Sequence, residues 1–313
     1  MKKLLCVLLI LGLLLSFCGC EEEQKPAKAN PKKEQETAYV EPLSWKTMPE
    51  NYELTAKQYF VYDCESDTFL TISGAETEKI YPASITKLFT AYVATQFLNM
   101  DRTITVGDAL NYVAGGSSVA ELERGDTVTV AMLVEAMMLP SGNDAAYVLA
   151  VAAGRGLSEK TVTTDEAIYL FVNEMNRQAK ALGMTNTHFA NPDGIHQEDH
   201  YSSFHDLAIL GTVVQEDPVL MSCVGIAKDQ VTLESGTKEW KNTNALIHED
   251  SEFYCPYAIG LKTGQTPSAG SCLLSAFEYR GKTMVIGVFG CPDVDDRFAD
   301  TLHLFNTAIG YKG

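Results

Sequence analysis

The periodicity of the apolar residues changes twice along this chain, and this change limits the possible folds more than any other feature. Segments 58–64 and 68–73 are rich in strand-forming residues and flank the turn residues Glu65-Ser66-Asp67. Helical spacing then predicts helices over 84–98, 130–138, 143–153, 166–182 and 203–214. Strand-like alternation returns at 230–233, 257–262, 271–279 and 282–289, before a closing amphipathic helix over 295–309. Strands at both ends of a helical middle predict a mixed α/β domain with an inserted helical lobe, roughly 100–215.

The first twenty residues have the features of a secretory signal. Lys2 and Lys3 precede an apolar run over 4–17, which is shorter than the about 20 residues that a membrane-spanning helix needs. The run ends at Gly19-Cys20, a small residue before a cysteine, which resembles a bacterial lipobox. We therefore expect residues 1–19 to be a signal peptide and Cys20 to carry lipid. The alternative is cleavage without lipid, which would give a secreted protein.

Segment 20–50 is polar and contains Pro26, Pro31 and Pro42. Because it offers almost no apolar surface to offset the entropy of ordering, we expect a disordered tether. The remainder, 51–313, has a length that suits one large domain or two fused lobes.

Acidic residues outnumber basic ones by 41 to 24, so the net charge is −17, and it becomes −19 when Lys2 and Lys3 leave with the signal. This balance argues against nucleic acid as a partner and against electrostatic docking on anionic lipid. Membrane attachment is therefore expected through the N-terminal lipid. Of the eight cysteines, five remain in the domain. They show no CxxC spacing, and we interpret them as core or strand residues with at most one pair. These five are Cys64, Cys223, Cys255, Cys272 and Cys291.

The first chemically informative motif is Ser84-Ile85-Thr86-Lys87, which lies where the helical periodicity begins. A spacing of three residues on a helix places Lys87 one turn from Ser84, on the same face. A serine hydroxyl becomes a nucleophile when a base takes its proton, and lysine is such a base once its pKa is lowered. Ser235-Gly236-Thr237-Lys238 repeats the pattern in a polar turn with no helix behind it, and we interpret it as a chance occurrence.

Two further motifs gain meaning together with the first. Ser141-Gly142-Asn143 follows Pro140, and it is either a plain inter-helix turn or a rigid corner that presents a hydroxyl and a carboxamide to a cleft. Lys262-Thr263-Gly264 ends a predicted strand, either as a solvated strand end or as an edge that a substrate backbone can approach. S-x-x-K, S-x-N and K-T-G in this order are the motif set of penicillin-binding proteins and β-lactamases.

The chain resembles the low-molecular-mass D-alanyl-D-alanine carboxypeptidases, the S11 serine peptidases. The resemblance covers roughly 54–311 and includes Gly116-Ser117-Ser118, Met175-Asn176, Asn191-Pro192-Asp193-Gly194, His200-Tyr201-Ser202-Ser203 and the segment 262–270. It implies a β-lactamase-like or penicillin-binding-protein-like fold, in which an antiparallel sheet of about five strands is flanked by helices. It also implies a monomer that needs no cofactor or metal and that β-lactam antibiotics inhibit.

The resemblance further implies a role for each motif residue in removing the terminal D-alanine from a peptidoglycan stem peptide. Ser84 would be the nucleophile, Lys87 its base, and Ser141 the proton relay to the departing amine. Lys262 would hold this hydroxyl network and the anionic terminus in place, and Asn143 would bind the peptide backbone.

The same resemblance implies the groups that stabilise the transition state and the terminus. The backbone NH groups of Ser84 and Gln265 would form the oxyanion hole. Thr263 and Arg297 would bind the terminal carboxylate, because a guanidinium fork suits a carboxylate. For Arg297 the alternative is a surface ion pair with Asp293, Asp295 or Asp296.

Two other functions remain open at this point. A serine β-lactamase shares the three motifs but needs a base for fast deacylation, in class A a glutamate of an ExxLN loop. Glu166 and Glu174 are the candidates, yet Tyr169 and Gln178 stand where leucine and asparagine are needed. The second possibility is a non-catalytic penicillin-sensing or wall-binding module.

Gly281-Lys282-Thr283 lacks the first glycine of a phosphate-binding loop, because Ala276 occupies that position, and it predicts a strand-to-strand turn. His196 and His200 have zinc-like spacing, but Gln197 replaces the glutamate of HExxH. We interpret His188, His196, His200 and His205 as polar loop residues.

Overall fold

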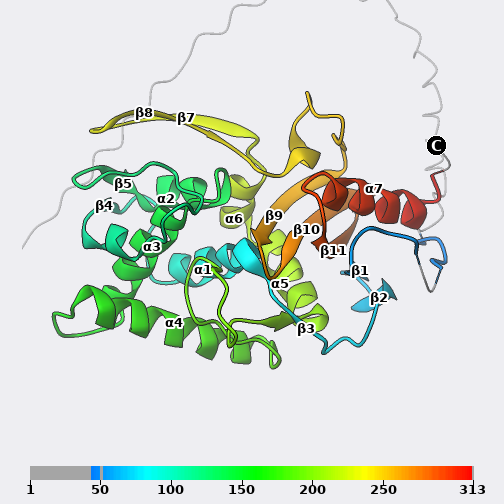
Figure 1. Ribbon diagram of the computed structural model, residues 1–313, viewed down its shortest axis with the longest axis horizontal. Coiled ribbons are helices and arrows are strands. Elements are labelled where there is room, and N and C mark those ends of the chain that lie inside the picture. The colour runs from blue at the N-terminus through cyan, green and yellow to red at the C-terminus, as the bar shows by residue number, and fades with distance from the viewer. Residues whose placement is uncertain (1–43, 50–51, 312–313) are drawn as a thin grey trace, which may run out of the picture. The chain divides into compact units, whose positions relative to one another are not determined.

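A five-stranded antiparallel sheet forms the framework of the domain (Figure 1). The computed structural model describes residues 44–49 and 52–311, so the predicted signal peptide, Cys20 and most of the tether lie outside the described residues. Neighbouring strands pair antiparallel in the order β2-β1-β11-β10-β9, which leaves β9 at one edge. The predicted mixed α/β fold is therefore confirmed. The strands are β1 (Gln58–Asp63), β2 (Thr68–Ile72), β9 (Ala258–Thr266), β10 (Gly270–Tyr279) and β11 (Lys282–Cys291).

Helices cover both faces of this sheet. On one face α7 (Asp296–Ile309) packs against β10 and β11, with the Phe277 and Phe305 rings stacked at 4.4 Å. The other face meets α5 (Phe204–Glu216) and, beyond it, the helical lobe. Because both faces are covered, β10 is buried at seven successive positions, Ser271 and Ser275 included, and does not alternate between buried and exposed residues.

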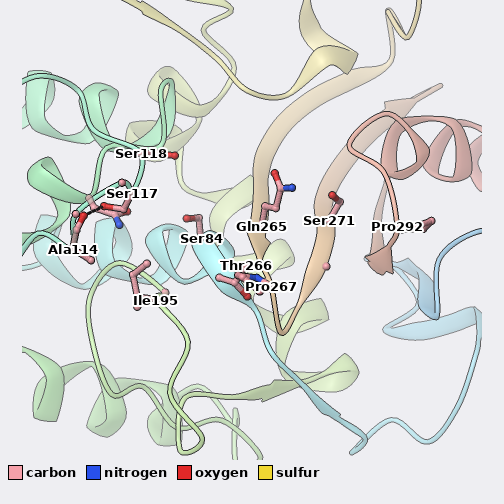
Figure 2. A pocket seen from close by; sticks show the side chains of 15 residues that line it. Ser84, Ala114, Ser117, Ser118, Ile195, Gln265, Thr266, Pro267, Ser271 and Pro292 are labelled. Carbon is pink, nitrogen blue, oxygen red and sulfur yellow. Dashed lines mark hydrogen bonds between the residues drawn. The ribbon is translucent and has the colours of Figure 1, made fainter.

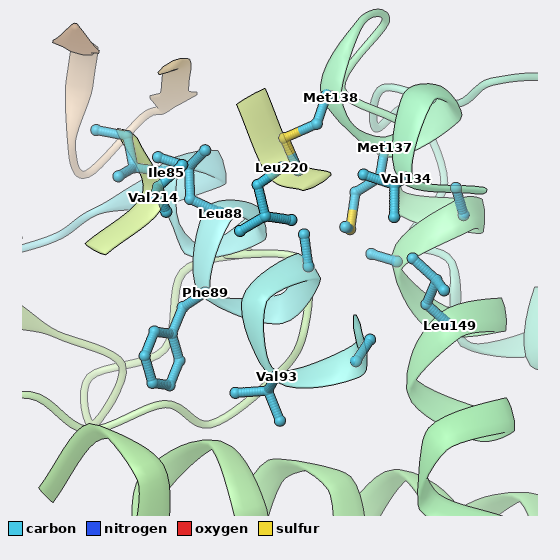
Figure 3. Close-up of a cluster of buried hydrophobic side chains, with 14 of the residues drawn as sticks. Ile85, Leu88, Phe89, Val93, Val134, Met137, Met138, Leu149, Val214 and Leu220 are labelled. Carbon is cyan, nitrogen blue, oxygen red and sulfur yellow. The ribbon is translucent and has the colours of Figure 1, made fainter. Parts of the chain in front are cut away.

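The helical lobe surrounds α1 (Thr86–Thr95), of which eight of the ten residues are buried. Figure 3 shows Leu88, Phe89 and Val93 of α1 among side chains from α2 (Val130–Met138), α3 (Asn143–Gly156) and α6 (Pro218–Val224). Because the helix is enclosed on nearly every side, its polar residues Thr86, Lys87 and Thr90 are buried together with its apolar ones. This burial removes the first turn of α1 from water.

Helix α4 (Thr164–Ala181) shows why a helix starts where it does. Thr163 accepts from the Glu166 NH, and the Glu166 carboxylate accepts from the Thr163 NH, which together form a capping box. The helix packs on α3 so closely that a Cβ at Gly154 would lie 1.9 Å from the Ala167 carbonyl oxygen. The prediction of a helix over 166–182 is correct in type, with its start two residues too late.

The predicted strand 230–233 belongs to a separate hairpin and not to the main sheet. β7 (Lys228–Leu233) pairs only with β8 (Gly236–Lys241), and Trp240 anchors the hairpin by donating to the Ala120 carbonyl at 3.0 Å. Two more short pairs are β3 (Lys79–Ile80) with β6 (Ser202–Ser203) and β4 (Thr103–Thr105) with β5 (Thr127–Thr129). The 3₁₀ turns are η1 (Ala83–Ile85), η2 (Asp108–Tyr112) and η3 (Ala245–Ile247).

The ordered domain begins before residue 51, which corrects the expected end of the tether. The Lys46 NH donates to the Ala308 carbonyl of α7 at 2.9 Å, and Met48 is buried among the side chains beneath α7. Trp45 packs against the same cluster. Trp45 and Met48 are apolar residues in an otherwise polar segment, and their packing adds buried apolar surface to this cluster.

Two further observations concern the described part of the chain. No single helix there is long and apolar enough to cross a bilayer, although α5 and α6 together pass by length and composition with a 95° bend between them. All five of its cysteines are free, and four of them are buried. The interpretation of these cysteines as core or strand residues fits this burial.

Candidate active site

Ser84 and Lys87 lie on successive turns at the start of α1, as their spacing predicts. Ser84 is the middle residue of η1, and Ala83 before it adopts a positive φ of 48°, unusual for a residue with a Cβ. The Lys87 Nζ lies 2.8 Å from the Ser84 Oγ, within hydrogen-bond distance. Ser84 is half-buried and lines a cavity, whereas Lys87 is fully buried behind it. The hydroxyl therefore faces the cavity and the amine supports it from inside.

Burial controls the protonation of Lys87. Removal from water lowers the pKa of Lys87 to about 8, against the partial opposition of the Asp193 and Asp144 carboxylates. The amine also donates to the Asp193 main-chain carbonyl at 2.7 Å, which orients it. A substantial fraction of Lys87 is thus neutral near physiological pH and able to accept a proton from Ser84.

The loop around Asp193 packs directly behind the nucleophile. The Asn191 side chain folds this loop, because its Oδ1 accepts from the Gly194 NH at 2.8 Å and its Nδ2 donates to the Ile195 carbonyl at 2.8 Å. Gly194 has a φ of +86°, and a Cβ there would lie 1.9 Å from the Ala83 carbonyl oxygen. Only glycine permits this approach.

We expect Gly194→Ala to destabilise the domain by about 1–3 kcal/mol or more and to slow acylation of Ser84, because the clash moves the carbonyl that orients Lys87. Thermal unfolding and the rate of penicillin adduct formation measure the two effects. Gly156→Ala is the control, since a Cβ at Gly156 meets nothing within 4 Å. Equal behaviour of the two variants would contradict the prediction.

His200 is a buried part of this loop, which corrects its interpretation as a polar loop residue. It is 2% exposed; its Nδ1 accepts from the Ala190 NH at 3.1 Å, and its Nε2 lies 2.8 Å from the Thr86 Oγ1. Burial lowers the pKa of His200 to about 3, so the ring is neutral and Nε2 carries the proton donated to Thr86. His200 therefore ties the loop to the first turn of α1. In the sequence its only signal was the segment His200-Tyr201-Ser202-Ser203, one of those that carry the family resemblance.

Ser141-Gly142-Asn143 forms the tight corner between α2 and α3. Ser141 adopts a positive φ of 63° and is buried, and Asn143 begins α3 and lines the cavity. The neighbouring Asp144 carboxylate accepts from the Ala120 and Leu122 NH groups, which holds the segment before β5 against the corner. A Cβ at Gly142 would lie 2.7 Å from the Ala136 carbonyl oxygen. The rigid-corner interpretation is the one that fits these contacts.

Strand β9 carries the third motif past the nucleophile. A Cβ at Gly264 would lie 3.2 Å from the Ser84 nitrogen, so the glycine allows the strand to pass close to η1. Lys262 is buried, which contradicts a solvated strand end, and its Nζ donates to the Thr263 carbonyl at 3.2 Å. Burial, with the cations of Lys87 and Arg297 nearby, lowers the pKa of Lys262 well below its usual value.

Thr243 connects the second and third motifs. Its NH donates to the Leu139 carbonyl at 3.0 Å, just before the Ser141 corner, and its hydroxyl lies 2.6 Å from the Thr263 Oγ1. One residue thus joins the helical lobe to the edge strand across the cleft. No sequence motif pointed to Thr243.

Arg297 lies in the first turn of α7 and is buried. Its guanidinium Nη1 approaches the Gly264 carbonyl at 3.5 Å, and no carboxylate of the described residues pairs with it within 4.0 Å. The alternative of a surface ion pair with Asp293, Asp295 or Asp296 is therefore wrong. A buried guanidinium without a counterion is suited to bind an anion.

The cavity has a volume of about 600 Å³ (Figure 2). Ser84, Asn143 and Gln265, one from each motif region, line it, together with the 114–118 loop and Ile195. Lys87, Ser141, Lys262, Thr263 and Arg297 are buried and are not among the lining residues. The three distant motifs therefore converge on one cleft.

Residues outside the three motifs that have similar patterns play structural roles. The Ser235 hydroxyl and NH bind the Asp126 carboxylate, and Lys238 pairs with Glu123 at 3.5 Å, so the second S-x-x-K belongs to the β7–β8 hairpin. Gly281 lies in the turn between β10 and β11, as predicted. Glu166 caps α4 and Glu174 pairs with Arg177, and neither lines the cavity. Within residues 44–49 and 52–311, no group of three or more metal-ligating side chains could hold an ion.

An active serine beside a buried lysine, a serine-asparagine corner and a lysine-threonine-glycine edge strand define the penicillin-recognising class of active-serine enzymes. Residues 45–292 match the sequence profile of peptidase family S11, described as D-alanyl-D-alanine carboxypeptidase. The chain belongs to this family and is a serine peptidase, a hydrolase.

Individual relatives agree with this assignment. A D-alanyl-D-alanine carboxypeptidase of Streptomyces strain K15 is 34% identical over 76% of this chain and 82% of its own length. The carboxypeptidase DacF of Bacillus subtilis is 30% identical over 74% of this chain, which spans 57% of the length of DacF. The crystal structure of the Streptomyces K15 DD-transpeptidase superposes with a TM-score of 0.75 at 30% identity, covering 84% of this chain and all of that one. The crystal structure of penicillin-binding protein D2 of Listeria monocytogenes, bound to cefotaxime, superposes with a TM-score of 0.67 at 28% identity. The match covers 85% of this chain and all of that one.

Proposed function

We propose that this enzyme removes the terminal D-alanine from peptidoglycan stem pentapeptides through an acyl-enzyme on Ser84. The observation that carries the proposal is the 2.8 Å contact between the Ser84 hydroxyl and the desolvated Lys87 amine at the wall of a cavity shared by all three motif regions. In acylation the Ser84 Oγ attacks the carbonyl of the penultimate D-alanine, and Lys87 takes its proton. The bond to the last D-alanine then breaks, and water releases the shortened peptide in a second step.

The remaining residues act on the leaving group and on the developing charge. Ser141 relays a proton to the departing amine, and Lys262 holds this hydroxyl network. The NH groups of Ser84 and Gln265 stabilise the oxyanion, a contribution of about 2.7–4 kcal/mol for each donor. Asn143 binds the peptide backbone, and Thr263 with Arg297 binds the terminal carboxylate. The last assignment is supported by the buried guanidinium of Arg297, with which no carboxylate of the described residues forms an ion pair.

We also propose that β-lactams acylate Ser84 and leave slowly. The β-lactamase alternative needs a base positioned at the acyl-enzyme, and Glu166 and Glu174 are both engaged elsewhere on α4. A non-catalytic sensing module is disfavoured because each reactive position holds a competent residue.

The proposal extends to location and assembly. The enzyme acts outside the cytoplasm as a monomer, after removal of residues 1–19, and is attached to the membrane through lipid on Cys20 or, without lipid, is secreted. The polar segment after Cys20 tethers the domain to the lipid. Metabolic labelling with a palmitate analogue, compared with Cys20→Ala, tests the lipid.

The decisive experiment measures D-alanine release from a diacetyl-Lys-D-Ala-D-Ala peptide by purified mature protein. We expect steady release by the wild type. In parallel, the intact mass after mixing with penicillin should show one adduct that persists over an hour, located on Ser84 by peptide mapping. No D-alanine release would refute the carboxypeptidase, and rapid return to the free mass would favour the lactamase.

A further inference from the structure

Two buried polar atoms near the end of the cleft have no hydrogen-bond partner among the described residues. They are the Ser271 hydroxyl oxygen and the Arg297 Nε. Ser271 is 1% exposed and Arg297 is 6% exposed, so bulk water does not readily satisfy either group. Buried polar groups in folded proteins are almost always paired, and an exception needs an explanation.

Both groups lie on the same face of the sheet. Leu273 of β10 packs in the cluster beneath α7 with Phe298, and Ser271, two residues earlier on the strand, points to the same face. The β9–β10 register places Ser271 opposite Gln265 and Leu273 opposite Thr263. Ser271, Thr263 and Gln265 therefore share the face on which α7 carries Arg297.

Ser271 also belongs to the cavity of the nucleophile. It lines the same cavity as Ser84 and Gln265, and Figure 2 shows the Gln265 and Ser271 side chains on adjacent strands, directed to the same side. The Arg297 Nη1 reaches the carbonyl of Gly264, the residue before Gln265. The Ser271 hydroxyl thus lines this end of the cleft, and the Arg297 guanidinium lies buried next to the part of β9 that borders it.

The Thr263 hydroxyl, in contrast, is already engaged. It lies 2.6 Å from the Thr243 hydroxyl, and the Lys262 amine approaches it at 3.5 Å. Of the Thr263 and Ser271 hydroxyls, only that of Ser271 has no partner among residues 44–49 and 52–311. A ligand that supplies two acceptor oxygens would satisfy Ser271 and the Arg297 Nε together.

We infer that Ser271 is a substrate-binding residue whose hydroxyl donates a hydrogen bond to the terminal carboxylate of the stem peptide, which Arg297 binds through its Nε. The inference rests on the proposed function and adds to it a second, neutral donor for the carboxylate. A carboxylate accepts from several donors at once, and hydrogen bonds to it are stronger than those to a neutral group. Ser271 thereby contributes to the selection of peptides with a free carboxyl terminus.

The test compares Ser271→Ala with the wild type on two peptides, diacetyl-Lys-D-Ala-D-Ala and the same peptide with its terminal carboxylate amidated. Because a hydrogen bond to a charged group is worth about tenfold or more in binding, kcat/KM for the free acid should fall about tenfold. On the amidated peptide, kcat/KM of the variant should stay within about twofold of the wild-type value, because the amide places no full negative charge beside the Ser271 hydroxyl. Adduct formation with benzylpenicillin and with its methyl ester gives a second readout of the same ratio.

Ser275→Ala is the matched control, since Ser275 is also buried on β10 but donates to the Gly260 carbonyl at 3.0 Å, away from the cleft. It should keep the wild-type ratio between acid and amide. Equal losses on both peptides in Ser271→Ala would mean a purely structural role, and no loss on either would mean that Ser271 does not contact substrate; both overturn the inference. If the alanine variant does not fold, Ser271→Cys, a near-isosteric and weaker donor, is measured in its place.

Failure of the inference and failure of the proposed function give different results. If the wild type releases no D-alanine, the proposed function is contradicted, and so is the inference that rests on it. If wild type is active and Ser84→Ala is not, the function holds, and the acid-to-amide ratio of Ser271→Ala alone decides the role of Ser271.

Discussion

Replacing Ser84 by alanine is expected to abolish D-alanine release and to eliminate the covalent penicillin adduct. No other hydroxyl of the described residues contacts the Lys87 amine within hydrogen-bond distance, so nothing replaces the lost nucleophile. Loss of the nucleophile in an enzyme with covalent catalysis typically lowers kcat by on the order of 10⁴-fold or more. Coupled detection of free D-alanine and intact-mass measurement after penicillin give the two readouts. Because Ser84 is half-buried and small, the thermal midpoint should change little.

The chain contains its own control for this experiment. Ser235 and Lys238 have the same spacing, but Ser235 binds the Asp126 carboxylate at the tip of a hairpin. Ser235→Ala should retain D-alanine release and the adduct while losing some stability of the hairpin. An adduct that forms on Ser84→Ala at the wild-type rate would exclude Ser84 as the acylated residue.

Replacing Lys87 by methionine should have the second largest effect and should act in opposite directions on activity and stability. Without the base, acylation should slow by about 10²–10⁴-fold. The buried amine costs stability, because its pKa is lowered from 10.5 to about 8, which corresponds to about 3 kcal/mol at a pH below both values. Methionine fills the same space without a charge, so the variant should be at least as stable as wild type near pH 7 despite the lost hydrogen bonds to Ser84 and Asp193.

The stability and the acylation rate of the wild type should both depend on pH through Lys87. In the unfolded chain Lys87 binds its proton more tightly than in the folded one, so its contribution raises the stability of the wild type as pH increases from about 8 to 10.5. The methionine variant should lack this rise. Wild-type acylation should likewise increase through pH 8, as the neutral amine becomes populated. Unfolding in urea between pH 6 and pH 10 measures the change in stability, and penicillin acylation rates over the same range measure the change in reactivity. A wild-type rate that is constant across this range would contradict the role of Lys87 as base.

Much of the architecture could be predicted because the information for it is local. Apolar spacing identified the main helices and all five strands of the main sheet, and the β10–β11 turn was expected at Gly281. The β9 strand was placed correctly but extends beyond its predicted end to Thr266. The burial of Lys262 within it results from tertiary packing, which a sequence window cannot show. Segment 230–233 has strand character, yet no local signal says that it pairs with β8 instead of the main sheet.

The amino-acid sequence by itself determined which reactive groups this protein has and their order, because a serine one helical turn before a lysine is a local relation. The tertiary structure alone decided what those groups can do. Burial of α1 lowers the pKa of Lys87, and no carboxylate in the described part of the chain pairs with Arg297, which leaves its guanidinium available to an anion. Tertiary packing alone brings three further residues to the site from distant segments, namely His200, Thr243 and Ser271. Desolvation and unpaired charge depend on every neighbour in space, whereas periodicity depends only on neighbours in the chain.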